Sequence, residues 1–234
     1  VMPAPYLSAT NSRSRSGRAS SSRPSRSRSD RRSERSSGVV PVVTAAASSS
    51  GAWDRERGPT ESTEFSLTRF LVPFLSDYQG ISIFMDCDFL VRYDIADLEY
   101  EMAKFDVMGT GPAVLVCKHD YTPKSDTKFL RQQQTAYPKK NWSSLMVFNN
   151  AKCRALTPAY VASASGLDLH RFNWLEDDQV GSLPLDYNWL VGEYPPNPDA
   201  RGIHYTLGGP WFDATKNCDH ADLWRSERDK IGTW

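Results

Sequence analysis

The stretch Ile81-Ser82-Ile83-Phe84-Met85-Asp86-Cys87-Asp88-Phe89-Leu90 decides the predicted fold, because an apolar run ends abruptly on two aspartates. A short, continuous apolar run is typical of a strand that is buried on both faces of a sheet. In open α/β sheets, ligands bind outside the carboxyl ends of such strands. Two carboxylates at that edge can supply oxygen ligands to a divalent cation. A solvated turn at the end of a strand is the alternative, and this motif alone does not separate the two.

Apolar patterning along the rest of the chain predicts an alternation of helices and strands. Further strands are expected over 113–117, 145–150 and 203–206, with a short strand and turn over 183–189. Helices are expected over 64–77, 94–104, 157–166 and 219–230. Thr157 followed by Pro158 is typical of a helix start. Pro73 should kink or loosen the first helix, because proline has no N–H to donate. Such alternation predicts the α/β class with a mainly parallel sheet.

Residues 1–52 differ sharply in composition from the remainder. They contain nine arginines against Asp30 and Glu34, a net charge of +7, so 53–234 carries −7 because the whole chain is neutral. The serine- and arginine-rich part lacks the apolar residues that would offset the entropy of ordering, and we expect a disordered tail. An arm for nucleic acid or another acidic surface, a linker controlled by phosphorylation and a transit-like segment are the alternatives.

Composition limits the class of protein that the remaining 182 residues, 53–234, can form. An aromatic content of 12% with seven tryptophans favours a globular core over a fibrous protein. The four cysteines (Cys87, Cys117, Cys153 and Cys218) are widely spaced, which argues against a disulfide framework and favours a reducing compartment such as the cytoplasm. No apolar run reaches the ~18 residues of a membrane span, so none is expected.

Several motifs occur in a fixed order after residue 60. They are Arg69-x-x-x-Pro73, Asp86-x-Asp88, Asn141-Trp142-Ser143-Ser144, Asp178-Gln179 and His204-Tyr205-Thr206-Leu207-Gly208-Gly209-Pro210-Trp211. This order resembles the nucleotide-sugar glycosyltransferases of the GT-A fold, in particular the glycogenin-like and galactosyltransferase group often called family 8. The chain is similar still more closely to uncharacterised bacterial, plant and algal glycosyltransferases, through KHDY (118–121), KNWSS (140–144) and NWLVGEY (188–194). The resemblance covers about 60–225.

The resemblance implies a partial GT-A domain over 53–234 and a set of site residues. Asp86, Asp88 and His204 would bind Mn²⁺ or Mg²⁺. Contacts to the donor are expected from Arg69 (which would pair with phosphate or hold Asp86), Lys118, Asp86 and Gly208. Asn141, Asp178 and Gln179 would form the catalytic, acceptor side. The strand, helix and second strand that form the uridine pocket of the family have no recognisable counterpart here, and Gly209 replaces a lysine of the family.

The expected function is transfer of a sugar from a nucleoside-diphosphate donor, with UDP-sugars favoured, to a hydroxyl acceptor. Retention of the anomeric configuration is implied by the resemblance alone. The alternative is an inactive domain of this type whose basic arm binds nucleic acid or another acidic partner; on the enzyme hypothesis nucleic acid is not a partner. Taken singly, Arg69 also fits an exposed helix arginine, His204 a half-buried histidine, and Asp178-Gln179 a solvated turn.

Overall fold

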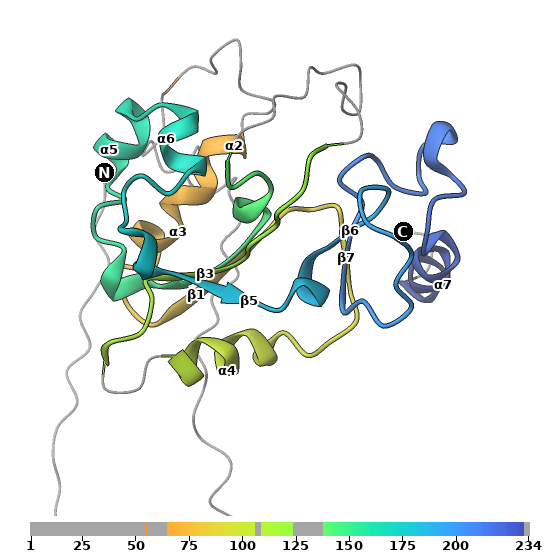
Figure 1. Cartoon of the computed structure of the whole chain (residues 1–234), viewed down its shortest axis with the longest axis horizontal. Coiled ribbons are helices and arrows are strands. Elements are labelled where there is room, and N and C mark those ends of the chain that lie inside the picture. The colour runs from red at the N-terminus through yellow and green to blue at the C-terminus, as the bar shows by residue number, and fades with distance from the viewer. Residues whose placement is uncertain (1–54, 56–64, 106–108, 124–137, 232–234) are drawn as a thin grey trace, which may run out of the picture. The chain divides into compact units, whose positions relative to one another are not determined.

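The structure is a computed structural model that describes residues 55, 65–105, 109–123 and 138–231 (Figure 1). Every described residue belongs to one compact unit within Gly38–Trp234. The predicted tail over 1–52 lies outside the described residues, as do residues 124–137.

The larger sheet has four strands in the order β1-β4-β3-β5. These strands are β1 (Ile81–Met85), β4 (Leu145–Asn149), β3 (Val114–Cys117) and β5 (Val180–Leu183). β4 runs antiparallel to both of its neighbours, whereas β3 and β5 pair in parallel. The fold is therefore mixed α/β, and the prediction of a mainly parallel sheet is wrong for the described strands.

The reason for this error lies in how β3 and β4 are buried. Every residue of β3 is buried, and so are the first four residues of β4. Both strands read as continuous apolar runs because they are covered on two faces, and burial on two faces carries no information about strand direction. The direction of β4 follows from its tertiary placement between β1 and β3.

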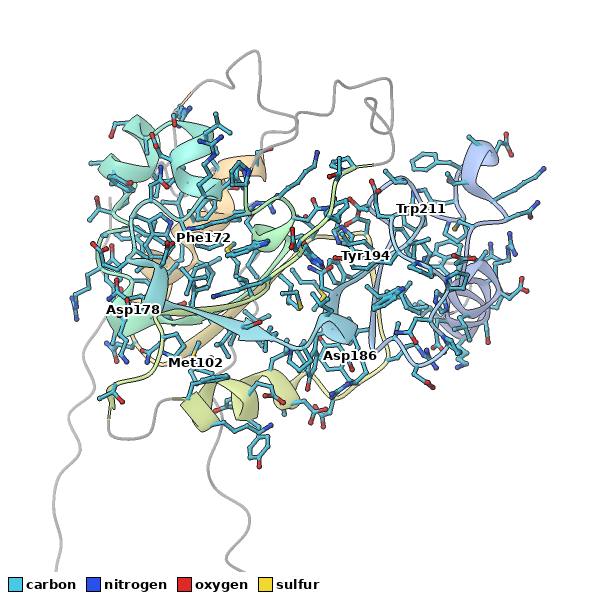
Figure 2. All side chains as sticks on the ribbon, in the orientation of Figure 1. Met102, Phe172, Asp178, Asp186, Tyr194 and Trp211 are labelled. Carbon is cyan, nitrogen blue, oxygen red and sulfur yellow. The ribbon has the colours of Figure 1, made fainter. Side chains whose placement is uncertain are left out.

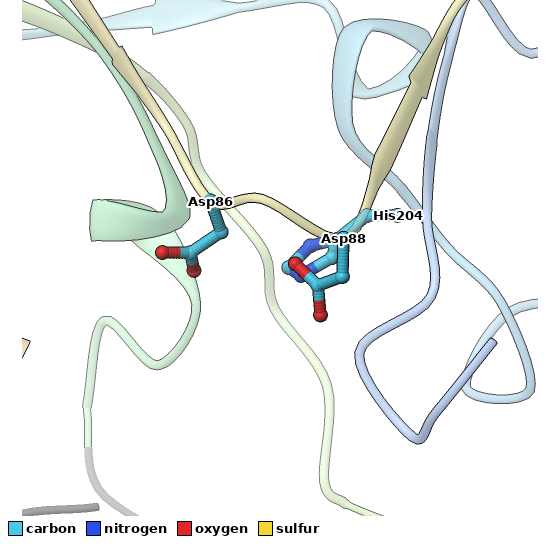
Figure 3. Close-up of side chains that lie close together, drawn as sticks. All are labelled: Asp86, Asp88 and His204. Atoms are coloured by element: carbon cyan, nitrogen blue, oxygen red, sulfur yellow. The ribbon is translucent and has the colours of Figure 1, made fainter. Parts of the chain in front are cut away.

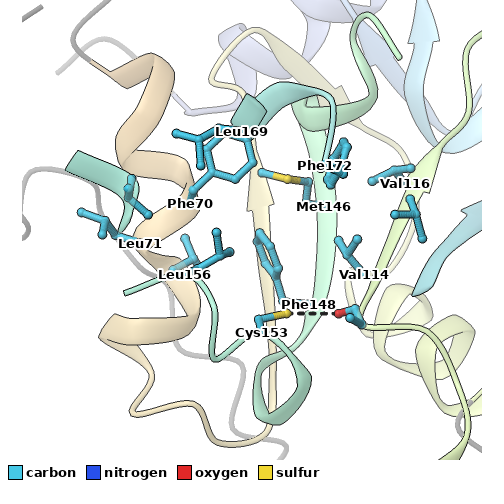
Figure 4. Packing of buried hydrophobic residues seen from close by; sticks show 14 of the residues in the cluster. Phe70, Leu71, Val114, Val116, Met146, Phe148, Cys153, Leu156, Leu169 and Phe172 are labelled. Carbon is cyan, nitrogen blue, oxygen red and sulfur yellow. Dashed lines mark hydrogen bonds between the residues drawn. The ribbon is translucent and has the colours of Figure 1, made fainter. Parts of the chain in front are cut away.

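Alternate residues of the central strands enter two separate cores, the first of which is drawn in Figure 4. On one face, the strands contribute Val114, Val116, Met146 and Phe148 to a core that also contains Phe70, Leu71, Leu156 and Phe172. On the other face, they contribute Leu115, Cys117, Leu145 and Val147 to a core that also contains Leu98 and Met102. This two-residue period is the one that a pleated strand imposes on its side chains.

A second sheet has three strands in the order β2-β7-β6. They are β2 (Phe89–Val91), β7 (Gly202–His204) and β6 (Trp189–Leu190), with β2 antiparallel and β6 parallel to β7. The stretch 81–90 thus contains the expected strand, β1, and the start of a second strand, β2, in another sheet, with Asp86, Cys87 and Asp88 between them. β2 was not predicted, because an apolar run interrupted by two acids reads as a strand that ends.

The first predicted helix is divided into three short pieces. It consists of α2 (Phe65–Thr68), the 3₁₀ turn η1 (Arg69–Leu71) and α3 (Val72–Leu75). The 3₁₀ turn directly precedes the first turn of α3, where Pro73 lies. The predicted loosening before Pro73 is confirmed, because proline cannot donate the hydrogen bond that would join the preceding turn.

The other helices follow the expected order. They are α4 (Ala96–Phe105), α5 (Pro158–Ser163), α6 (Gly166–His170) and α7 (Ala221–Ile231). The Thr157 hydroxyl accepts a hydrogen bond from Tyr160 N at 3.1 Å, which confirms the predicted start of α5. The helix ends earlier than expected, because Ser165 caps a separate helix, α6. Among the described helices, none combines the length and the apolar character that crossing a membrane requires.

Short 3₁₀ turns join several of these elements. They are η4 (Trp142–Ser144), η5 (Asn150–Lys152), η6 (Asp177–Gln179), η7 (Leu185–Asn188) and η8 (Asp213–Thr215). η4 leads directly into β4, and η7 leads directly into β6. Both turns contribute residues to the candidate site described below, as does η1 through Arg69.

Replacing Gly202 with alanine tests how closely β7 packs on η7. A methyl group at this position would overlap the backbone carbonyl of Tyr187, which cannot move as a flexible side chain can. We expect Gly202→Ala to lower the free energy of unfolding by about 3 kcal/mol, the upper part of the range for overpacked cores. The measurement is urea denaturation of the wild type and the variant.

Gly166→Ala is the matched control. A methyl group there meets Leu67 Cδ2 at 3.7 Å, an ordinary van der Waals contact, in the first turn of α6. This variant should unfold at the wild-type urea concentration or slightly above it, because alanine restricts the unfolded chain. Equal midpoints for Gly202→Ala and Gly166→Ala would contradict the assigned packing.

Candidate metal centre

Three potential metal ligands meet where the chain passes from the first sheet to the second. Asp86 follows β1, Asp88 precedes β2, and His204 is the last residue of β7. One ligand atom from each lies within 4.8 Å of the other two, and Figure 3 shows the two carboxylates and the imidazole gathered at this crossing. Strand pairing brings the histidine here, because His204 is the partner of Phe89 across β2 and β7.

Asp86 is held by its side chain and by its backbone. Arg69 Nη2 lies 3.0 Å from Asp86 Oδ1, and Arg69 Nη1 donates to the Ser143 carbonyl at 2.9 Å. The guanidinium also lies over the Phe84 ring, 4.7 Å from its centroid. Asp86 N donates to the Ser144 carbonyl at 2.9 Å. Of the two roles predicted for Arg69, the structure shows the one in which it fixes Asp86.

A hydrogen-bond chain determines which nitrogen of His204 carries a proton. The Ser144 hydroxyl donates its only proton to the Asn141 carbonyl at 2.7 Å, so its oxygen accepts from Asn188 Nδ2 at 2.8 Å. This orients Asn188 Oδ1 toward His204 Nδ1 at 2.9 Å. Because an amide oxygen only accepts, Nδ1 must be protonated.

The remaining nitrogen of His204 is the one that faces the carboxylates. Nε2 lies 3.3 Å from Asp88 Oδ1, and the His204 side chain is almost completely buried. In a neutral imidazole, Nε2 is a hydrogen-bond acceptor, and so is Asp88 Oδ1. Two acceptors this close repel each other, and a cation bound by both atoms would stabilise the pair. Metal-binding histidines usually donate their other N–H to an oxygen, as His204 does to Asn188.

The donor set therefore fits a small divalent cation. Two carboxylates and one imidazole are ligands that Mn²⁺ and Mg²⁺ accept, and the absence of a thiolate in the cluster argues against a structural zinc site. Both carboxylates remain partly exposed, at 28% for the Asp86 side chain and 30% for the Asp88 side chain. Such exposure leaves room for water or a phosphate oxygen to complete the coordination of the ion.

Two of the other predicted site residues lie around η4. Asn141 has a left-handed backbone (φ 61°) and donates from Nδ2 to the Tyr121 hydroxyl at 2.6 Å. The Lys118 ammonium lies 5.6 Å from the centre of the Trp142 ring. Asn141 is linked to the metal cluster because its carbonyl accepts a hydrogen bond from the Ser144 hydroxyl. Lys118 follows the end of β3 and lies next to η4.

Gly208 belongs to the turn after β7. Its φ of +106° is a conformation that favours glycine, and Gly208 N donates to the Tyr205 carbonyl at 2.8 Å. At the neighbouring Gly209, any side chain would overlap the ring of Trp211. The lysine of the resembled family therefore cannot be accommodated at position 209 while Trp211 keeps its place.

Asp178 and Gln179 lie at the opposite end of the sheet, contrary to the predicted catalytic role. Gln179 O accepts from Ala113 N at 2.8 Å, which places it before the start of both β3 and β5. The Gln179 side chain accepts from Glu176 N and closes a capping box. Figure 2 shows Asp178 well separated from Tyr194. Tyr194 N donates to the carbonyl of Leu190, the residue that pairs with the metal ligand His204. Both predicted residues are exposed, and the structure does not bring them to the metal ligands.

Sequence reasoning assigned no role to several residues that the structure places at the site. Asn188 and Ser144 position His204, and His119 forms a hydrogen bond with Tyr194 (Nδ1 to Oη, 2.8 Å). All four belong to the stretches KHDY, KNWSS and NWLVGEY that carry the family resemblance. The presence of these three stretches in one sequence therefore indicated that they belong to the site. It did not indicate which of their side chains form hydrogen bonds with one another.

Comparison with known proteins places the chain in a family. No family model matches the sequence, and no solved structure matches it. It is 45% identical over 199 residues to Protein CDI of Arabidopsis thaliana, an alignment that covers 82% of this chain and 74% of that protein. Identity at this level over most of both chains is shown by the members of one family, and the chain therefore belongs to the family of Protein CDI.

Proposed function

We propose that this protein is a metal-dependent glycosyltransferase that transfers a sugar from a nucleoside-diphosphate donor to a hydroxyl acceptor. The observation that carries the proposal is the Asp86, Asp88 and His204 cluster, in which Asn188 leaves His204 Nε2 facing the carboxylates. The order of the sequence motifs, which resembles that of GT-A glycosyltransferases, supports the same reaction class. The donor most consistent with that resemblance is a UDP-sugar.

The reaction needs stabilisation of the negative charge that develops on the leaving diphosphate. Asp86, Asp88 and His204 would hold Mn²⁺ or Mg²⁺, and such an ion supplies Lewis-acid stabilisation of that charge when bound. Arg69 keeps Asp86 in place through its ion pair, so the carboxylate does not reorganise when the substrate arrives.

Lys118 directly follows the end of β3 and lies beside η4. We assign it the role of binding the phosphates of the donor. Its ammonium lies over Trp142, and a flexible lysine can swing from a ring face to a phosphate. This assignment replaces the contact that the resembled family makes from position 209. Gly208 keeps its proposed place near the donor because its turn follows His204 directly.

Replacing Asp88 with asparagine tests the proposed activity. The substitution keeps the size of the side chain and removes one charge from the proposed ligand set. We expect Mn²⁺-dependent hydrolysis of the preferred UDP- or GDP-sugar to fall by about 100-fold, at the upper end of losses caused by disturbing metal sites. The measurement is the release of nucleoside diphosphate from a panel of sugar donors, with and without Mn²⁺.

Asp178→Asn is the matched control for this experiment. It makes the same chemical change at an exposed aspartate at the other end of the sheet, so turnover should stay at the wild-type value. Equal turnover in the wild type and Asp88→Asn would exclude the proposed metal role. No turnover in any of the three proteins would favour an inactive domain of this type.

Replacing Asn188 with leucine tests how His204 is positioned. The change removes the acceptor of the Nδ1 proton, so His204 can rotate or adopt the other tautomer. We expect the affinity for Mn²⁺, measured by electron paramagnetic resonance titration of free Mn²⁺, to fall by about 10- to 100-fold. This readout does not depend on any substrate.

Asn150→Leu provides a closely matched control. Asn150 is also fully buried and also donates from Nδ2 to a serine hydroxyl (Ser82, 2.8 Å), but it follows the far end of β4. Both variants should lose thermal stability, whereas only Asn188→Leu should lose Mn²⁺ affinity. A parallel loss of affinity in both variants would show that general destabilisation, and not the orientation of His204, is responsible.

A further inference from the structure

A hydrogen bond between His119 and Tyr194 connects the two sheets beside the metal cluster. His119 follows β3, and its carbonyl accepts from Trp142 Nε1 at 2.9 Å, which ties it to η4. On the other side, Tyr194 N donates to the carbonyl of Leu190, the residue that pairs with His204. The bond from His119 Nδ1 to the Tyr194 hydroxyl (2.8 Å) therefore joins two segments that each contact an element bearing a metal ligand. One is tied to η4, whose Ser144 carbonyl binds Asp86 N, and the other follows β6, which pairs with β7 and His204.

The other ring nitrogen of His119 has no partner in the part of the chain that is described. His119 is 5% exposed, and its Nε2 is buried without a hydrogen bond. Burial, with a smaller contribution from His204, lowers the pKa of His119 to about 3, so the imidazole is neutral at physiological pH. A buried polar atom without a partner lowers the stability of the folded chain, and a ligand that supplies the missing hydrogen bond would remove this loss.

Two partly exposed aromatic rings lie beside this histidine, and a third packs on one of them. Tyr121 and Tyr194 lie 6.3 Å and 5.7 Å from the His119 ring, and Trp189 lies 5.0 Å from Tyr194, measured between ring centres. We call His119, Tyr121, Trp189 and Tyr194 the aromatic group. Partly exposed aromatic faces suit the C–H faces of a sugar, while a neutral imidazole suits a hydroxyl better than an anionic phosphate.

We propose that the aromatic group is a sugar-binding subsite beside the metal cluster, in which His119 Nε2 forms a hydrogen bond with a hydroxyl of the bound sugar. This subsite rests on the proposed function, because that function defines the two molecules that could bring a sugar to it, the nucleoside-diphosphate donor and the acceptor. The bound sugar is either the glycosyl group of the donor or a sugar of the acceptor, since both have the same hydroxyl and ring chemistry. Tyr194 is a positioning residue that orients the imidazole.

The test compares binding of nucleotides and sugars by the full chain in Mg²⁺. In one arm, calorimetry gives Kd for UDP and GDP and for their glucose, galactose and mannose conjugates. In the other arm, saturation-transfer NMR detects millimolar methyl glycosides of the same sugars. If the subsite holds the sugar of the donor, we expect one sugar conjugate to bind about tenfold more tightly than its free nucleotide. If the subsite holds a sugar of the acceptor, we expect saturation transfer to a methyl glycoside.

His119→Ala and Tyr194→Phe should both remove the sugar-dependent signal. Tyr194→Phe deletes one hydroxyl and keeps the ring, so it remains informative if His119→Ala does not fold. Tyr93→Phe is the control, because the Tyr93 hydroxyl is buried without a hydrogen bond among the described residues and packs on Tyr187 in another core. This variant should bind sugar as the wild type does.

The two proposals fail in different ways in this experiment. Nucleotide binding without any sugar-dependent signal, or a sugar signal that is equal in all four proteins, would overturn the subsite and leave the proposed function standing. A methyl glycoside signal that depends on His119 in a chain that binds no nucleotide would support the subsite and overturn the proposed function.

Discussion

The candidate site depends on the hydrogen bonds of Ser144. Its carbonyl accepts the backbone N–H of Asp86, and its hydroxyl accepts from Asn188, which in turn accepts the Nδ1 proton of His204. One residue therefore fixes a ligand from the end of β1 and, through Asn188, a ligand from the end of β7. Ser144 is 3% exposed, so water does not compete for these bonds.

The left-handed backbone of Asn141 is the local feature that allows this arrangement. With φ at 61°, Asn141 turns the chain so that its carbonyl accepts from both the N–H and the hydroxyl of Ser144. Asparagine tolerates this conformation better than most residues, which gives a structural reason for Asn141 that is separate from any contact with substrate. The aromatic group then lies beside the same turn, because Trp142 donates to His119 and Asn141 donates to Tyr121.

Local patterns in the sequence predicted most of the elements. The end of β1 at Met85, the capped start of α5 after Thr157 and the irregular turn before Pro73 were all predicted from neighbouring residues. Strand direction was not predictable in the same way, since β4 is buried on both faces like a parallel strand. The clustering of His204 with the aspartates entered only through the family resemblance. The same resemblance implied a catalytic, acceptor-side role for Asp178 and Gln179, which lie at the other end of the sheet from the metal ligands.

The sequence by itself determined that a strand ends on Asp86, that Asp88 lies one residue further, and that helices and strands follow in a given order. These properties depend on side-chain period, turn chemistry and proline, all of which act between neighbours in the chain. Only the tertiary structure decided that β4 is antiparallel, that His204 donates from Nδ1 to Asn188 Oδ1, and that Gln179 lies at the far end of the sheet. The physical reason is that strand register and hydrogen bonds between distant residues depend on which surfaces pack together, and no local pattern records that choice.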